Sequence, residues 1–515
     1  MTVGVVDPLR GMATRLRGPG ATLEVAGLTG GFWMLVLIAR LFAGGTIGMA
    51  DQGDSRRLLC QLGVRADRPF SARPSSYVTT TWVEHSWYGE ACGADGSGEP
   101  YRSSQLVLLR MAKHLTAAFD LPGALDLRAV GILCSLVVGF AVAALVLVLP
   151  GRTWLRVMFA SLVGLLAADA AVAEYFVSAY SEAAGLLGIL LLCPALLWLW
   201  RDGRSTWPRL ICVAMAATFA MTAKSQTTTL LPAILLALVL VPHRGLGGGR
   251  PRQRSLREVT SRWPGLLTCV LLTVTATSFL SHNPRRFEEL TAYNQVFIEI
   301  LPKSRDKAGD LRSLGVDPAL AQGSGRSILD PASVARLPGY LEFRREVDQA
   351  GIVRFYATHP GRLPGLAAEG LRGMTVWRQD YLGTYTADSG QPAGSRECRI
   401  CAYATLFGSA RILPLSIVLL WALVLVGGIK VVRRRHLGHA QRAIGRLAIV
   451  LVTAAVSQFA AVMLSQGLSR PENLIFTNFL TGLCVPTALA CVWLLTSQVP
   501  DDQPPRRRPE PSGGR

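Results

Sequence analysis

Charged residues are scarce in this sequence of 515 residues. Aspartate, glutamate, lysine and arginine together make up only 17% of the chain, while hydrophobic residues make up 50% of it. The mean hydropathy is +0.33. A chain of this composition is expected to carry its apolar residues in long uninterrupted blocks, which ordinary soluble proteins do not contain. The shortage of charge therefore argues against an ordinary soluble protein.

Three further absences narrow the class. We find no internal repeat of roughly 20 to 50 residues, which argues against a solenoid or a propeller. No base-stacking or groove-reading element accompanies the basic residues, so the net charge of +19 does not indicate a nucleic-acid-binding protein. The motif Cys398-x-x-Cys401 lacks the two further ligands that a tetrahedral metal site needs, and we predict no metal site there.

Long apolar blocks are what the sequence does contain. Several reach the roughly 17 to 25 residues that cross a hydrocarbon core, and each must be helical because lipid offers no partner to an unpaired backbone group. The first block begins too far from Met1 for a removed signal peptide, so we interpret it as a retained span. We predict about ten spans, of which the fifth and sixth are short. They cover residues 27–44, 127–149, 157–172, 183–200, 210–221, 230–241, 264–280, 412–428, 447–464 and 474–495.

The arginines lie beside these spans, in alternate connections. Arg152 and Arg156 join the second span to the third, a longer basic connection covers residues 244–257, and Arg433 and Arg434 follow the eighth span. This is the positive-inside pattern, and it predicts a multi-pass protein with both termini in the cytoplasm. The arginines are therefore interpreted as topology signals.

The predicted fold class is an all-α polytopic membrane protein with two extracytoplasmic subdomains. Two large polar segments fall outside the membrane in this topology, one after the first span and one between the seventh and eighth. The predicted divisions are a cytoplasmic N-terminus at 1–26, membrane helices one to seven at 27–280 with an outer loop at 50–126, an extracytoplasmic domain at 281–410, helices eight to ten at 411–498 and a disordered cytoplasmic tail at 499–515.

Four of the ten cysteines lie outside the predicted spans. Cys60 with Cys92 and Cys398 with Cys401 could form disulfides in an oxidising compartment, although four cysteines allow three connectivities and the sequence does not choose among them. The other six are interpreted as small apolar residues within the spans.

Ionisable residues gather at the outer ends of the spans, where each is a candidate for function. Lysine and arginine could hold a phosphate group, since the arginine fork matches phosphate oxygens, and a carboxylate could take the proton of an attacking hydroxyl. Other interpretations stay open: the aspartates could cap a surface helix, the cations could extend to headgroups, and the tyrosine could anchor the interface. The residues are Asp51 and Asp54 after the first span, Tyr180 and Glu182 before the fourth, Lys224 between the fifth and sixth, and Arg470 before the tenth.

Short motifs in this order resemble those of bacterial GT-C-type membrane glycosyltransferases, in particular the group of glycan-biosynthesis hexose transferases. The resemblance covers most of the chain, and each motif is short and degenerate. Two departures are Lys-Ser-Gln where the family pattern has Lys-Pro-Gln, and Arg470-Pro471 where an acidic or glycine-rich turn is expected. The motifs are Gly53-Asp54-x-x-Arg57, Leu125-Asp126-Leu127-Arg128, Ser178-Ala179-Tyr180-Ser181-Glu182, Ala223-Lys224-Ser225-Gln226, Tyr293-Asn294-Gln295-Val296-Phe297, Leu311-x-x-Leu314-Gly315 and Glu472-Asn473-Leu474.

The resemblance implies an enzyme of the bacterial plasma membrane that takes a sugar from a polyprenyl-phosphate donor and places it on an extracytoplasmic glycan acceptor. It implies a catalytic base at Asp54 with Asp51 as its neighbour, and donor-phosphate binding by Lys224 and Arg470. The residues expected to bind substrate are Arg57, Tyr180, Glu182 and Gln226. A divalent cation could assist the phosphate, but no recognisable site for one is present.

Two other classes remain open. A transporter or flippase of a lipid-linked saccharide would use similar outer charges, although such proteins commonly show internal repeats and paired broken helices, which we do not find. A non-catalytic partner in envelope assembly is compatible with two sizeable outer segments.

Overall fold

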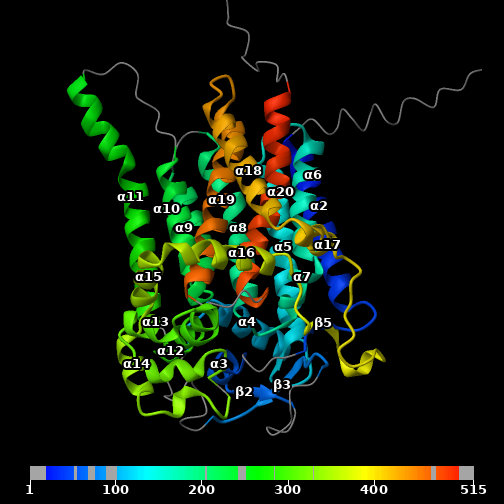
Figure 1. Ribbon diagram of the computed structural model, residues 1–515. Helices are drawn as coiled ribbons and strands as arrows, with labels where there is room; N and C mark the ends of the chain where they lie inside the picture. The colour runs from blue at the N-terminus through cyan, green and yellow to red at the C-terminus, as the bar shows by residue number, and fades with distance from the viewer. Residues whose placement is uncertain are drawn as a thin grey trace, which may run out of the picture.

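The computed structural model describes residues 19–50, 55–67, 76–87, 101–202, 206–241, 251–282, 285–328, 330–465 and 471–497. These residues are mostly helical. Figure 1 shows long helices side by side, with the short strands and most of the short helices toward the lower end of the view. The predicted architecture of a mostly helical, polytopic membrane protein is confirmed.

Seven helices in the described part of the chain are long and apolar enough to cross a membrane. Each falls on one of the predicted spans, because a long apolar run can satisfy its backbone in lipid only as a helix. The seven are α2 (Pro19–Phe42), α5 (Leu127–Val148), α8 (Glu182–Trp200), α11 (Pro251–Ser281), α18 (Leu415–Arg433), α19 (His439–Ser465) and α20 (Pro471–Thr496).

The predicted count of ten spans is not confirmed. The third predicted span is a bent pair, in which α6 (Thr153–Ala168) meets the segment Ala170–Val177 at 56°, so the count is seven, or eight if this pair is one span. The fifth is α9 (Trp207–Met221), and the sixth is η5 (Ser225–Leu230) followed by α10 (Leu231–Val239); both are shorter apolar helices.

The first two long helices, α2 and α5, approach each other closely at paired glycines. A Cβ placed on Gly30 would lie 2.4 Å from the carbonyl oxygen of Gly139, and a Cβ placed on Gly139 would lie 2.8 Å from the carbonyl oxygen of Gly30. Small residues at a helix crossing permit this backbone contact, which is how helices associate in lipid. The glycines therefore set the spacing of two helices that lead to the strand-bearing end of the bundle.

Short antiparallel strands tie the outer segments to the helix ends. β1 (Ile47–Met49), directly after α2, pairs with β5 (Leu382–Tyr385). A second sheet has the order β2 (Val64–Ala66), β3 (Thr81–Glu84) and β4 (Leu125–Asp126), and Asp126 then caps α5 by accepting a hydrogen bond from the backbone N–H of Arg128 at 2.8 Å. The two outer segments thus meet through β1 and β5.

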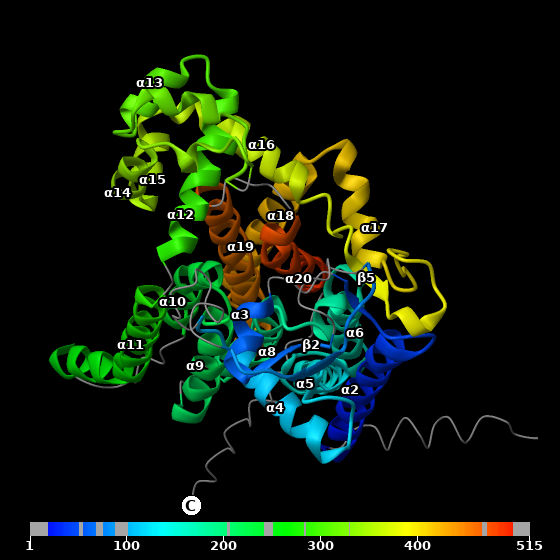
Figure 2. The ribbon, with the colours of Figure 1, turned by 90° about the horizontal axis from the view of Figure 1, so that it is seen from below.

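The second outer segment has its own aromatic core. The rings of Tyr293 and Phe297 lie 4.6 Å apart, and those of Phe297 and Phe343 lie 5.2 Å apart, all buried. Figure 2 views the molecule from below and shows α12 to α15 on one side of the helix bundle and α17 on the other side. The helices are α12 (Arg285–Tyr293), α13 (Lys307–Ser313), α14 (Tyr340–Glu346), α15 (Gln349–Thr358), α16 (Leu363–Gly373) and α17 (Ala402–Ser409), while α3 (Arg56–Leu59) and α4 (Gln105–Ala118) belong to the first outer segment.

Candidate functional site

A polar cavity of about 170 Å³ lies at the strand-bearing end of the bundle. Four of the predicted site residues line it, and they come from three separate stretches of the chain: Arg57, then Tyr180 and Glu182, then Lys224. The structure brings these residues together because the bent pair, α8 and η5 all end or begin at this level. Whether they bind substrate remains a prediction.

Lys224 and Glu182 form an ion pair inside the cavity. The Nζ atom of Lys224 lies 2.8 Å from Oε1 of Glu182, and the glutamate side chain is 6% exposed against 23% for the lysine. The backbone N–H of Lys224 donates to Oγ1 of Thr227 at 3.1 Å, which fixes the turn that opens η5. The lysine therefore presents its charge to the cavity from a defined position, and a neighbouring carboxylate balances that charge.

Tyr101 forms part of the cavity wall beside this pair. Burial raises the pKa of its phenol, and the ammonium group of Lys224 opposes that rise in pKa. The phenol is therefore protonated at neutral pH, and its hydroxyl can donate a hydrogen bond.

Tyr381, Glu472 and Asn473 are among the cavity residues that are absent from the predicted site. The hydroxyl of Tyr381 donates to Oε2 of Glu472 at 3.0 Å, so a tyrosine from the second outer segment orients a carboxylate at the start of α20. Glu472 and Asn473 could have been predicted as site residues, because the motif that contains them resembles the family pattern. The sequence around Tyr381 contains no motif that indicates a site.

Gln226, predicted to bind substrate, is not among the cavity's lining residues in the part of the chain that the structure describes. Its Nε2 donates to the backbone oxygen of Asn473 at 2.6 Å, and its backbone oxygen accepts from Nε2 of Gln458 at 3.2 Å. These buried contacts join η5 to α19 and α20. The structure thus places Gln226 behind the cavity wall, where it positions Lys224 relative to Asn473.

The predicted bases Asp51 and Asp54 and the predicted phosphate ligand Arg470 lie outside the described residues. The nearest described lining residues on either side of the two aspartates are Met49 and Arg57. The backbone N–H of Ala50 donates to the oxygen of Tyr381 at 3.0 Å. The described chain therefore borders the cavity both before and after the aspartates.

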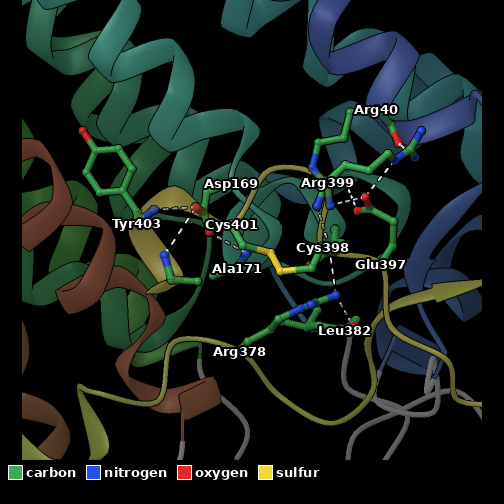
Figure 3. The surroundings of a disulfide bond; sticks show 12 residues. Arg40, Asp169, Ala171, Arg378, Leu382, Glu397, Cys398, Arg399, Cys401 and Tyr403 are labelled. Atoms are coloured by element: carbon green, nitrogen blue, oxygen red, sulfur yellow. Dashed lines mark hydrogen bonds and ion pairs between the residues drawn. A yellow bond between two sulfur atoms is a disulfide. The ribbon is translucent and has the colours of Figure 1, made fainter. Parts of the chain in front are cut away.

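A buried charged cluster lies next to this site, on the path from α2 to the second outer segment (Figure 3). Arg40, at the end of α2, binds Oε1 of Glu174 at 2.8 Å and also pairs with Glu397. Its Nε donates to the oxygen of Ala168 at 2.7 Å. Nε of Arg399 lies 2.7 Å from Oε1 of Glu397. The buried arginine is thus paired with two carboxylates, which Arg378 and Arg399 also contact.

The disulfide between Cys398 and Cys401 lies within the segment that this cluster holds. Asp169, at the bend between α6 and α7 (Ala170–Ala173), accepts from the backbone N–H of Tyr403 at 2.7 Å. Cys60 is also disulfide-bonded, and its suggested partner Cys92 lies outside the described residues. The backbone N–H of Glu397 donates to the oxygen of Gly383, so the segment also supports β5.

An apolar groove of about 720 Å³ lies on the other side of the cavity wall. Tyr101 and Lys224 line the cavity, whereas Arg102 and Thr222 line the groove. The two wall segments are held together by hydrogen bonds, from Oγ of Ser103 to the oxygen of Ala223 at 2.6 Å and from the backbone N–H of Ser104 to the oxygen of Thr222 at 2.9 Å. Helices α9 and α11 supply most of the apolar lining.

No group of three or more histidine, cysteine, aspartate or glutamate side chains that could hold a metal ion occurs among the residues that the structure describes. The polar side chains that line the cavity are those of one lysine, one arginine, two glutamates, four tyrosines, one serine and one asparagine.

These features define the class of protein: a polytopic helical membrane protein with a polar cavity at one end of its bundle. The family model described as the YfdI N-terminal transmembrane domain matches residues 23–494, and the chain therefore belongs to that family. No curated protein and no solved structure matches the chain. The family description supports a membrane protein and states no activity.

Proposed function

We propose that this protein is a GT-C-type glycosyltransferase that moves a sugar from a polyprenyl-phosphate donor to an extracytoplasmic cell-envelope glycan. The observation that carries the proposal is the cavity, in which Lys224 and two carboxylates, Glu182 and Glu472, lie one wall away from an apolar groove. A polar cavity with an apolar groove beside it suits a ligand that has a charged head and a hydrocarbon chain.

The proposed reaction needs one base and a stabilised leaving group. The acceptor hydroxyl oxygen forms a bond to the anomeric carbon of the sugar, and the bond from that carbon to the phosphate oxygen breaks. The electron pair leaves with the polyprenyl phosphate, and the base takes the hydroxyl proton. Lys224 is proposed to bind the departing phosphate, because an ammonium group stabilises the negative charge that develops there.

The base is proposed to be Asp54, with Asp51 beside it, as the family resemblance implies. Arg470 is the second proposed phosphate ligand, and Arg57 and Tyr180 are proposed to contact the sugar or the acceptor. The carboxylates of the cavity could also hold a divalent cation beside the donor phosphate. Transfer measured with and without such a cation tests this addition to the proposal.

The test is an assay of the purified protein in lipid with a panel of radiolabelled polyprenyl-phosphate sugars and an envelope glycan extract. Asp54→Asn keeps the shape of the side chain and removes the base, so we expect transfer to fall by about 10² to 10⁴-fold. Asp67→Asn, in the same outer segment, is the matched control and should transfer normally. Normal transfer by Asp54→Asn would show that Asp54 is not the base. If the folded wild type transfers no sugar from any donor, the proposal that the protein is a glycosyltransferase is contradicted.

One observation favours a second candidate, a transporter or flippase of a lipid-linked saccharide. The 56° bend between α6 and the following segment interrupts an apolar helix, and transporters use interrupted membrane helices to build a binding site. The residues at the bend do not line the cavity, which is lined instead by residues elsewhere in the chain, including Lys224 before η5 and Glu472 in α20. Movement of an intact labelled donor lipid across the membrane, with no transfer to the acceptor, would favour this candidate.

A further inference from the structure

The end of the bundle remote from the cavity carries a concentration of positive charge. Figure 1 shows the connection between α18 and α19 at the opposite end of the molecule from β2 and β3. Six basic side chains surround this connection, and none of them forms a salt bridge with any acidic residue that the structure describes. They are Lys430, Arg433, Arg434, Arg435, Arg442 and Arg446.

Arg446 differs from the rest because it is buried. It is 6% exposed, and its Nη1 atom is enclosed with no hydrogen-bond partner among the described residues. Arg442 lies one helical turn earlier, on the same face of α19. Its Nε atom is likewise enclosed and lacks a partner in the described part of the chain. A buried guanidinium and a half-buried one thus lie one turn apart on α19, and burying such charges is costly unless an anion accompanies them.

Arg40 in the same molecule is a buried arginine whose partners are groups of the protein itself. Arg40 is 3% exposed, and it binds the carboxylates of Glu174 and Glu397 and the oxygen of Ala168. All of these groups belong to the chain itself. Arg446 is buried to a similar extent, but it has no carboxylate partner among the described residues, and its Nη1 atom is available to an anion from outside the chain.

We propose that Arg446 and Arg442 bind the phosphate group of an anionic membrane lipid. A guanidinium group matches phosphate oxygens through two parallel N–H donors, which makes arginine suited to this anion. Arg446 lies seven residues after His439, the first residue of α19, which is about 10 Å along a helix axis and near the depth of the headgroups. The neighbouring helix α18 exposes Leu419 and Leu423 at 58% and 70%, as a lipid-facing helix does.

The site is independent of the proposed transferase activity. It lies at the opposite end of the bundle from the cavity, at the face that the positive-inside pattern predicts to be cytoplasmic. Basic pockets between membrane helices on that side are suited to anionic headgroups. The ligand's role is to stabilise the packing of α19 against its neighbours α18, α20 and α10.

The test measures the thermal unfolding midpoint of the full-length protein in nanodiscs made of phosphatidylcholine alone or of phosphatidylcholine with phosphatidylglycerol. A lipid that binds only the folded state raises the midpoint. We expect phosphatidylglycerol to raise the midpoint of the wild type by several degrees and to leave that of Arg446→Gln unchanged. Arg435→Gln changes an exposed arginine of the same connection and should respond as the wild type does.

A second arm adds inorganic phosphate to the phosphatidylcholine nanodiscs. If free phosphate stabilises the wild type and phosphatidylglycerol does not, the ligand of this site is a soluble anion and not a lipid. That result would overturn the proposal. An equal response of the wild type and Arg446→Gln, or no response of the wild type to either anion, would also overturn it. If Arg446→Gln does not fold, Arg442→Gln and Arg446→Lys are measured instead, and each should lose at least half of the response to phosphatidylglycerol.

Discussion

At the scale of single residues, Lys224 is the side chain whose replacement tests the cavity most sharply. Its ammonium group faces Glu182 at 2.8 Å and is proposed to bind the departing phosphate. We expect Lys224→Met to lower kcat/KM for transfer by about 10² to 10³-fold, as the loss of one charge-stabilising donor does. Lys224→Arg should retain part of the activity because it keeps the charge.

Lys303→Met is the matched control for that measurement, since Lys303 pairs with Glu299 and Glu369 in the second outer segment and does not line the cavity. Both variants are compared by initial rates over a range of donor concentrations. A Lys224→Met protein that is folded and transfers within about threefold of the wild type would contradict the phosphate-binding role.

The buried pair between Arg40 and Glu397 predicts a dependence of stability on pH. Burial alone would raise the pKa of the Glu397 carboxyl, but Arg40 and Arg399 together lower that pKa below its usual value. Because the folded-state pKa lies below the unfolded value of about 4.3, the pair stabilises the fold above that pH, and the stabilisation is lost as the pH falls through the lowered pKa.

We therefore expect Glu397→Gln to be destabilised at neutral pH, by about 3 kcal/mol, because it leaves Arg40 buried with one carboxylate fewer. The difference from the wild type should shrink as the pH is lowered from about 5 to about 3. Thermal unfolding in detergent at several pH values measures it. Asp380→Asn, at a fully exposed carboxylate, should follow the wild type, and a constant difference at all pH values would refute the role of the Glu397 charge.

At the scale of elements, the groove between α9 and α11 is proposed to receive the donor's hydrocarbon chain. Ala214 lines it, and Ala214→Trp would fill part of it. We expect KM for a long-chain polyprenyl-phosphate donor to rise about tenfold, which corresponds to about 1.4 kcal/mol of lost binding. KM for an analogue with a chain of one or two isoprene units should not change.

Ile211→Trp is the control for this prediction, because Ile211 is exposed on the same helix but does not line the groove. Kinetics with both donors, for both variants, separate the groove from general effects of a tryptophan on α9. Equal increases of KM for long and short donors would show that the groove does not hold the chain.

The positions of the long helices could be predicted because the need to pair every backbone group in lipid makes a long apolar run helical. The bend after α6 could not. It occurs at Asp169, whose carboxylate caps α7 and accepts from the backbone N–H of Tyr403. That partner lies more than 200 residues further along the chain, and no local pattern in the third predicted span indicates it.

At the scale of the whole molecule, the candidate site was partly predictable for a similar reason. Tyr180, Glu182 and Lys224 lie where apolar spans end, so the topology alone predicts that they share one face. Tyr381 enters the cavity from the second outer segment because β5 pairs with β1. Pairing between such distant strands leaves no periodic signal in either segment, and the sequence therefore gives no reason to choose this tyrosine.

The central claim is that the protein transfers a sugar covalently and does not move its lipid carrier intact. The most direct measurement uses sealed proteoliposomes that contain a polyprenyl-phosphate donor labelled in the sugar, with the glycan acceptor on the cavity side. We predict labelled glycan and an equal amount of free polyprenyl phosphate, with both products lost in Lys224→Met. Intact labelled donor that reaches the other leaflet, with no label in the glycan, would contradict the claim.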